Sequence, residues 1–226
     1  MWRRSLTAAA AAVLLGCRGQ GSTLDPAGPY AARIADLAWL MTGISTMIVV
    51  LVAAILAVAI VRRSRPSLWP EGRISDSALI VGGGILLPAL VLPLLWAVTL
   101  RDMRALADPP STPAVTIEIT AHQWWYEVHY PEHGRTLRDE LFIPSGQVVL
   151  LRVTSADVIH SLWIPRLTAK IDMIPGRTNH IWLQAEEPGS YLVLCAEFCG
   201  LWHARMQMRV VAEIPASFGA RMNGPG

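Results

Sequence analysis

A short loop of the sequence, "CAEFCGLWHARM", brings together Cys195, Cys199, His203 and Met206. Thiolate, imidazole and thioether groups form a ligand set that suits copper, and His160, upstream in "SADVIHSLWIP", could complete the site. Two thiolates could bridge two copper ions, each of which would also take one histidine. Two alternatives remain open. Paired cysteines in exported proteins most often form a disulfide, and zinc could use the same cysteines and histidines without the methionine.

The residues that must position this loop belong to a region with strand periodicity. Val115, Ile117 and Ile119 alternate with polar residues, which is the two-residue repeat of a half-buried strand. Short strand-like runs follow, separated by the turn-forming segments "SGQ", "PGR" and "EPGS": "WWYEVHY", "ELFIP", "VVLLRVTS", "HSLWIP", "HIWLQA", "YLVLC" and "MQMRVVA". No run has the pattern of a long amphipathic helix. We therefore expect an all-β sandwich or barrel over residues 106–215, followed by a C-terminal tail at 216–226.

The part of the chain before this domain is apolar enough to enter a membrane. The composition is 53% hydrophobic and only 16% charged, and residues 37–61 and 77–100 contain no charged side chain. Each interval is long enough to cross a hydrocarbon core of roughly 30 Å, so we expect two transmembrane helices there. The loop at 62–76 is rich in arginine, which predicts a cytoplasmic location. A buried helical hairpin in a soluble protein is the alternative.

The first residues, "MWRRSLTAAAAAVLLGC", have the layout of a secretory signal, because two arginines precede an apolar run too short to span a bilayer. The final "LLGC" resembles the lipobox of bacterial lipoproteins, where cleavage leaves a lipid-modified cysteine at the amino terminus. We expect a lipoprotein-type signal peptide at residues 1–16, lipidation of Cys17, and an exported segment at 17–36. A signal that is cleaved elsewhere, or not at all, is the alternative. If Cys17 carries lipid, only Cys195 and Cys199 remain for other chemistry.

Four segments together carry a resemblance to a known family. The runs "CAEFCGLWHARM", "SADVIHSLWIP", "KIDMIPGRTN" and "HQWW" resemble subunit II of the haem-copper cytochrome c oxidases, which carries a binuclear copper centre called CuA. The resemblance covers almost the whole chain after the signal. It implies a membrane-anchored all-β protein, in which an N-terminal two-helix transmembrane hairpin is followed by a cupredoxin-like β-sandwich or barrel.

The resemblance assigns a role to each candidate ligand. It makes Cys195 and Cys199 the bridging thiolates, and His160 and His203 the terminal imidazoles. Two weaker ligands complete the set, an axial thioether and a backbone carbonyl oxygen, and they come from Met206 and Glu197.

Two further roles follow from the resemblance. The side chain of Glu197 matches the family's ligand to a magnesium ion shared with subunit I. Trp124, the first tryptophan after the His-Gln pair, matches the surface residue through which electrons enter, although by itself it would suggest a core or membrane-interface aromatic. One position departs from the family. Val81 stands where many relatives have a glutamate at the start of a proton pathway, and Asp76 is a candidate replacement.

The resemblance implies a respiratory electron-transfer function. The chain would accept one electron at a time from ferrocytochrome c at CuA and pass it to the haem of subunit I, where oxygen is reduced to water with proton pumping. It would be one subunit of this proton-translocating oxidoreductase, cross the bacterial inner membrane twice, and place its copper domain on the periplasmic side. Its partners would be subunit I, the other oxidase subunits and cytochrome c, with no nucleic acid.

The charge distribution points to a basic donor. Residues 106–226 contain twelve Asp and Glu against nine Lys and Arg, although the whole chain is formally +2. An acidic face would steer a basic cytochrome c, and Asp157 and Glu127 are candidates for it. Two other functions are alternatives. A quinol-oxidase subunit II has lost the copper, which the intact ligand set argues against, and a membrane-tethered copper carrier would hold copper exchangeably.

Overall fold

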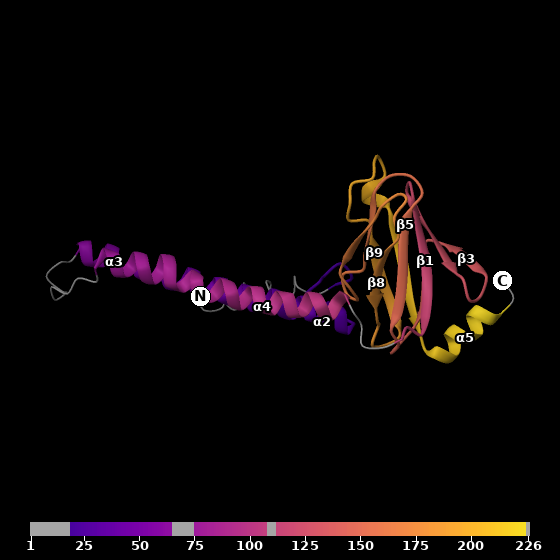
Figure 1. The fold of residues 1–226 in the computed structure, drawn as a ribbon, viewed down its shortest axis with the longest axis horizontal. Coiled ribbons are helices and arrows are strands. Elements are labelled where there is room, and N and C mark those ends of the chain that lie inside the picture. Colours follow the sequence, from indigo (N-terminus) through magenta and orange to yellow (C-terminus); the bar gives the residue numbers. More distant parts are fainter. Residues whose placement is uncertain (1–18, 65–74, 108–111, 225–226) are drawn as a thin grey trace, which may run out of the picture. The chain divides into compact units, whose positions relative to one another are not determined.

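A computed structural model describes residues 19–64, 75–107 and 112–224 of the chain (Figure 1). The chain divides into two compact units. One unit comprises residues 36–104, and the other combines the preceding residues with residues 105–226. Cys17 and the predicted signal peptide lie outside the described residues, as does most of the arginine-rich loop.

Two long apolar helices precede the β-domain. Helix α2 spans Pro29–Ser64, and a second helix is built from α3 (Asp76–Leu79), the π-helical turn η2 (Ile80–Leu86) and α4 (Leu87–Ala107). At about 1.5 Å per residue, each exceeds the roughly 30 Å of a hydrocarbon core. Both are long and apolar enough to cross a membrane, and they contain the two intervals predicted as spans.

The wide turn η2 has a cause in the sequence. Pro88 has no N–H to donate into the helix, and it follows soon after three consecutive glycines, Gly82–Gly84. The Leu87 N–H donates to the Gly82 carbonyl five residues earlier, which is the bond of a π-helix. Val81 lies within this turn.

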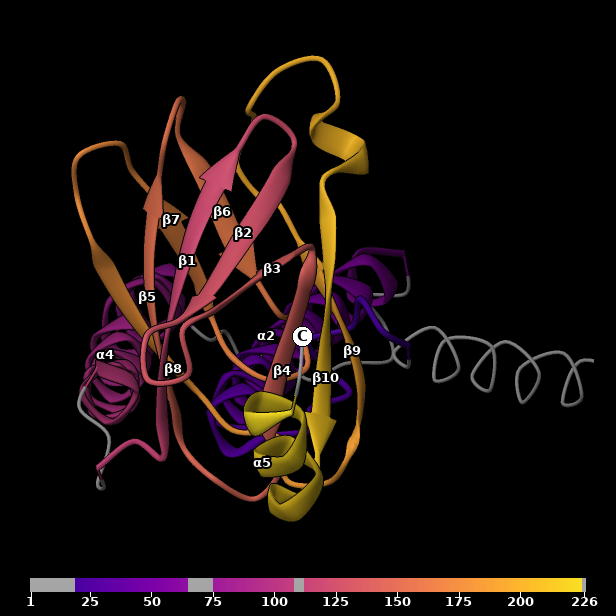
Figure 2. The ribbon, with the colours of Figure 1, turned by 90° about the vertical axis from the view of Figure 1, so that its right-hand side faces the viewer.

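Ten strands form the predicted sandwich, and two five-stranded sheets pack face to face in the orders β3-β2-β1-β5-β8 and β4-β10-β9-β6-β7 (Figure 2). Most neighbours are antiparallel, but β1 pairs with β5 and β4 pairs with β10 in parallel. The strands are β1 (Val115–His122), β2 (Trp125–Tyr130), β3 (Arg135–Arg138), β4 (Glu140–Pro144), β5 (Val149–Ser155), β6 (His160–Trp163), β7 (Lys170–Met173), β8 (Asn179–Leu183), β9 (Gly189–Leu194) and β10 (Gln207–Glu213).

The core lies between the two sheets and follows the expected alternation. In β1 every second residue is buried, beginning with Val115, and β5 alternates in the same way. Two buried tyrosines of β2 also bond to the opposite sheet. Tyr126 Oη donates to the Ser161 carbonyl of β6, while Tyr130 Oη both donates to the Phe142 carbonyl and accepts from the Phe142 N–H. These bonds hold the sheets together.

The C-terminal residues, expected as a tail, form the helix α5 (Pro215–Asn223). Proline is favourable in the first turn of a helix because its missing N–H would have no intrahelical partner. Phe218 and Met222, four residues apart, share one helix face and are both buried against the core. The helix therefore closes one end of the sandwich (Figure 2).

The segment before α2 is attached to the sandwich by hydrogen bonds, and we call residues 25–28 the N-terminal clasp. The Ala27 N–H donates to the Arg166 carbonyl at 2.7 Å, and the Glu186 N–H donates to the Ala27 carbonyl at 3.0 Å. The Arg166 guanidinium donates to the Asp25 carbonyl and pairs with its carboxylate. The segment predicted only as an exported stretch is thus part of the folded domain.

Candidate metal centre

Three loops meet at the end of the sandwich opposite α5 (Figures 1 and 2). The β9–β10 loop begins with Cys195 and ends with Met206, and its base is closed by the Cys195 N–H, which donates to the Met206 carbonyl. His203 starts a short 3-10 turn, η3 (His203–Arg205), within this loop. The β5–β6 loop leads into His160, the first residue of β6. The third is the β1–β2 connection, which carries Trp124.

The structure brings the predicted sulfur and nitrogen ligands together. The Sγ atoms of Cys195 and Cys199 are 3.8 Å apart, and both cysteines are free rather than joined in a disulfide. Cys199 Sγ lies 3.8 Å from Met206 Sδ and 3.6 Å from His203 Nδ1. The ligand atoms of His160, Cys195 and Cys199 all lie within 4.8 Å of one another. One compact cluster therefore contains all five side chains.

His160 is oriented for binding through one ring nitrogen. The residue is completely buried, and its Nε2 lies 2.8 Å from Asp157 Oδ1. Its Nδ1 is buried and has no hydrogen-bond partner among the described residues. A carboxylate on Nε2 favours the tautomer with its proton there, which leaves the Nδ1 lone pair free. A buried nitrogen without a partner, beside two free thiols, fits a metal ion.

The buried site favours uncharged thiols when no metal is present. Burial, and then the neighbouring Cys195, raise the pKa of the Cys199 thiol to about 12. Burial and the same cysteine also raise the pKa of Tyr126. A metal ion must therefore displace the Cys199 proton when it binds as a thiolate ligand.

Asp157 has the opposite tendency. Burial alone would raise its pKa, but hydrogen bonds from His160 and from the Gln123 and Val158 N–H groups outweigh that effect and lower it. Asp157 thus stays a carboxylate that orients His160. The sequence interpretation placed it on a docking face and missed this role, although its position three residues before His160 was the available signal.

Glu197 presents two groups in different directions. Its backbone carbonyl accepts from Cys195 Sγ at 3.3 Å, so the carbonyl faces the cluster. Its carboxylate lies 3.4 Å from Lys170 Nζ, which also contacts Asp172 at 3.0 Å. The carbonyl is placed where a metal ligand is expected, while a cation at the carboxylate would have to compete with the Lys170 ammonium.

Trp124 lies against the ligand loop. A Cβ added at Gly200 would come within 3.3 Å of its indole ring, so the ring packs closely on the residue after Cys199. Its indole N–H is buried and has no hydrogen-bond partner among the described residues. Neighbouring Gln123, which the sequence interpretation did not single out, donates from Nε2 to the Cys199 carbonyl at 2.8 Å.

The surface around the cluster is apolar, and we call it the apolar rim. Five large hydrophobic side chains on the two ligand-bearing loops are exposed, led by Leu201 at 83% and Phe198 at 77%: Val158, Ile159, Phe198, Leu201 and Trp202. In contrast, the acids of these loops are engaged, since Asp157 bonds to His160 and Glu197 pairs with Lys170. The rim therefore offers a contact surface dominated by apolar groups.

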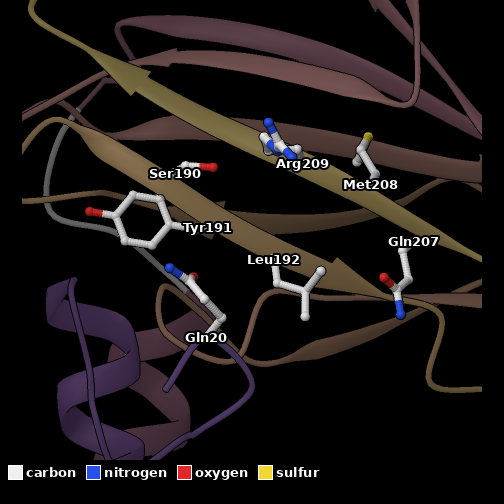
Figure 3. A pocket seen from close by; sticks show the side chains of 7 residues that line it. All are labelled: Gln20, Ser190, Tyr191, Leu192, Gln207, Met208 and Arg209. Carbon is white, nitrogen blue, oxygen red and sulfur yellow. The ribbon is translucent and has the colours of Figure 1, made fainter. Parts of the chain in front are cut away.

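A separate cavity of about 460 Å³ lies beside β9 and β10 (Figure 3). It contains none of the candidate ligands, and Gln20 from the segment before α2 closes one side of it. The residues that line it are Gln20, Ser190, Tyr191, Leu192, Gln207, Met208 and Arg209.

Comparison with known proteins agrees with the resemblance seen in the sequence. The family profile "Cytochrome C oxidase subunit II, periplasmic domain" matches residues 135–214. Cytochrome c oxidase subunit 2 of Alkalihalophilus pseudofirmus is 34% identical over 93% of this chain and 64% of its own length. The Bacillus subtilis protein of the same name is 32% identical over 92% of this chain and 64% of its own length.

A solved structure was also found, the periplasmic domain of subunit II of cytochrome oxidase from Bradyrhizobium japonicum. It aligns with 50% of this chain and 93% of its own length, at 30% identity and a TM-score of 0.48. The chain spans a little under two thirds of the length of the curated relatives that it matches. From the family profile and the similarity to these relatives along most of its length, the chain belongs to the cytochrome c oxidase subunit II family.

Proposed function

We propose that this chain is the electron-accepting subunit of a respiratory cytochrome c oxidase, with a binuclear copper centre in the cluster described above. One observation carries the proposal. The buried His160 Nδ1, which lacks a partner, lies within 4.8 Å of the free thiols of Cys195 and Cys199. A soft ligand set of this kind suits copper. A closed structural zinc site takes no thioether ligand and would leave Met206 without a role.

Each ligand has a defined task in this proposal. Cys195 and Cys199 would hold the copper as thiolates, and His160 and His203 would bind it through their imidazole rings. Met206 and the Glu197 carbonyl add weak ligands. A bound copper pair supplies reversible one-electron chemistry. Two features of the protein keep electron transfer fast because they limit movement of the ligands. Asp157 fixes the His160 ring, and the pairing of β9 with β10 closes the base of the loop that carries the cysteines.

The surroundings of the cluster support an electron-transfer route. We propose that Trp124 receives the electron from ferrocytochrome c and that the haem of subunit I is the acceptor, where oxygen is reduced with proton pumping. The apolar rim excludes water from the ligands and offers a contact face to these partners. The packing of the Trp124 indole on Gly200, next to Cys199, supports its role in the route.

We also propose a location for the chain. Helix α2 and the helix that ends with α4 cross the bacterial inner membrane, and the sandwich lies on the periplasmic side. Arg62 and Arg63 in the last turn of α2 support this orientation, because cytoplasmic loops are enriched in basic residues. Lipidation of Cys17 would add a second anchor, and mass spectrometry of the mature amino terminus tests it.

Glu197 is proposed to serve a magnesium ion shared with subunit I. In the isolated chain its carboxylate pairs with Lys170, so the ion must displace an ammonium group on assembly. Assembled oxidase carrying Glu197→Gln should therefore lose bound magnesium while its copper content is unchanged. Retention of magnesium by that variant would refute this assignment.

The decisive experiment for the copper centre uses the full chain, loaded with copper under conditions that keep its cysteines reduced. We expect two coppers per chain and a seven-line electron paramagnetic resonance signal, from one unpaired electron shared over both ions. His160→Ala should destroy the signal, whereas His180→Ala, which changes an exposed histidine on β8, should leave it intact. A single copper, or copper that a mild chelator removes from the assembled protein, would contradict the proposal and favour a copper carrier.

A further inference from the structure

Gln123 joins the segments that hold the metal ligands. Its backbone N–H donates to Asp157 Oδ2 at 2.7 Å, and the other oxygen of that carboxylate bonds to His160 Nε2 at 2.8 Å. Its side-chain Nε2 donates to the Cys199 carbonyl at 2.8 Å. One residue of the β1–β2 connection is therefore tied to both ligand-bearing loops, through partners 34 and 76 residues away in the chain.

The next residue, Trp124, depends on these ties for its position. Its indole N–H makes no hydrogen bond to a described residue, so packing alone holds the ring itself. That packing is close, because a Cβ on Gly200 would lie 3.1 Å from Gln123 Nε2 and 3.3 Å from the indole Cζ2. The amide of Gln123 and the ring of Trp124 thus lie together over the backbone of residues 199 and 200.

We infer that Gln123 is a positioning residue, which holds the Trp124 indole against the Cys199 segment and so sets the electronic contact between donor and metal centre. This inference rests on the proposed function. In the step concerned, one electron would pass from the ferrous haem of the donor to copper held by Cys199, and no atom or proton would be transferred. The rate of such a step falls steeply with separation, so a loosened indole slows it.

The test compares variants in the assembled oxidase, with reduced cytochrome c as donor. Gln123→Met keeps the length of the side chain and removes its donor group. Because loss of one hydrogen bond shifts a local equilibrium by about two- to tenfold, we expect the electron-transfer rate at saturating donor to fall by a similar factor. The KM for the donor and the copper electron paramagnetic resonance signal should not change. Amide hydrogen exchange around residues 123–125 should accelerate by the same factor.

The control is Gln184→Met, which removes a comparable glutamine Nε2 bond to a backbone carbonyl, that of Gly146. This variant should keep the full rate. Gly200→Ala approaches the same contact from the other side, since its Cβ would press on Gln123 and Trp124, and it should slow the saturated rate as Gln123→Met does. A changed KM, or an unchanged saturated rate in Gln123→Met, would overturn the inference.

Trp124→Phe separates this inference from the proposed function. If Trp124→Phe slows electron transfer and Gln123→Met does not, the positioning role fails while the proposed route stands. If Trp124→Phe also leaves the rate unchanged, the route through Trp124 itself is refuted.

Discussion

Replacement of Tyr130 by phenylalanine tests how the two sheets are held together. The Tyr130 side chain is fully buried, and its hydroxyl accepts from the Phe142 N–H at 2.7 Å and donates to the Phe142 carbonyl at 2.9 Å. Tyr130→Phe removes both bonds without a large change in volume. It also leaves a buried N–H and a buried carbonyl of β4 without their partners.

The expected loss of stability follows from these two bonds. Each contributes on the order of 1 kcal/mol, and a buried polar group left unpaired costs about 1–3 kcal/mol, so we expect a total loss of about 2–4 kcal/mol. For a domain of roughly a hundred residues this corresponds to a fall of the unfolding midpoint by about 10 °C. Tyr126→Phe is the matched variant, because that buried tyrosine makes one such bond, to the Ser161 carbonyl, and should lose about half as much.

The assay is thermal unfolding of the metal-free full chain in detergent, followed by near-ultraviolet circular dichroism of the aromatic side chains. Absence of metal removes any contribution from ligand binding to the measured midpoint. A loss for Tyr130→Phe that equals or falls below that of Tyr126→Phe would show that the cross-sheet bonds do not contribute as the geometry indicates.

Three other perturbations give distinct expectations. Burial raises the pKa of the Cys199 thiol from 9.0 to about 12, so the folded metal-free chain holds this proton more tightly than the unfolded chain does. The stability linked to this proton is therefore complete below pH 9 and is lost as the pH rises from 9 to 12. The unfolding midpoint should fall less steeply over that range in Cys199→Ser. Gly28→Ala would place a Cβ 2.0 Å from the Gln184 carbonyl oxygen, so the N-terminal clasp should detach from the sandwich and be cleaved faster by a protease. An unchanged rate of proteolysis would contradict the close contact between Gly28 and Gln184. Leu201→Asp should raise the donor KM about ten- to hundredfold, since burial of a leucine contributes about 1.5–3 kcal/mol. The KM of the wild-type protein should depend little on ionic strength, and a strong salt dependence would instead favour an acidic docking face.

Much of the fold could be predicted because its signals are local. The alternation in β1 and β5 follows directly from the requirement that one face of each strand be buried. The short strands β3 and β7 were missed, since neither shows a clear alternation of buried apolar residues. Helix α5 was missed for a similar reason, because a nine-residue segment with only two buried side chains, Phe218 and Met222, carries little periodic signal.

The candidate site, too, could be predicted only in part from the sequence. Its cysteines, one histidine and methionine share one loop, so their types and spacing could be recognised without a structure. The residues that hold them in place could not be recognised. Gln123 reaches Cys199 across 76 positions of sequence, and only the pairing of β1 with β2 and the packing of the two sheets determine that approach. Asp157 was assigned to the surface because sequence alone does not distinguish a solvated carboxylate from one bonded to a buried histidine.

The N-terminal clasp also constrains how many times the chain can cross a membrane. Residues 25–28 share backbone hydrogen bonds with the sandwich, so both must lie in the same aqueous compartment. A stretch of chain that starts and finishes in one compartment crosses the bilayer an even number of times, whichever compartment that is. If α2 crossed the membrane and the helix that ends with α4 did not, the N-terminal clasp could not form. The two helices therefore insert as a pair or not at all.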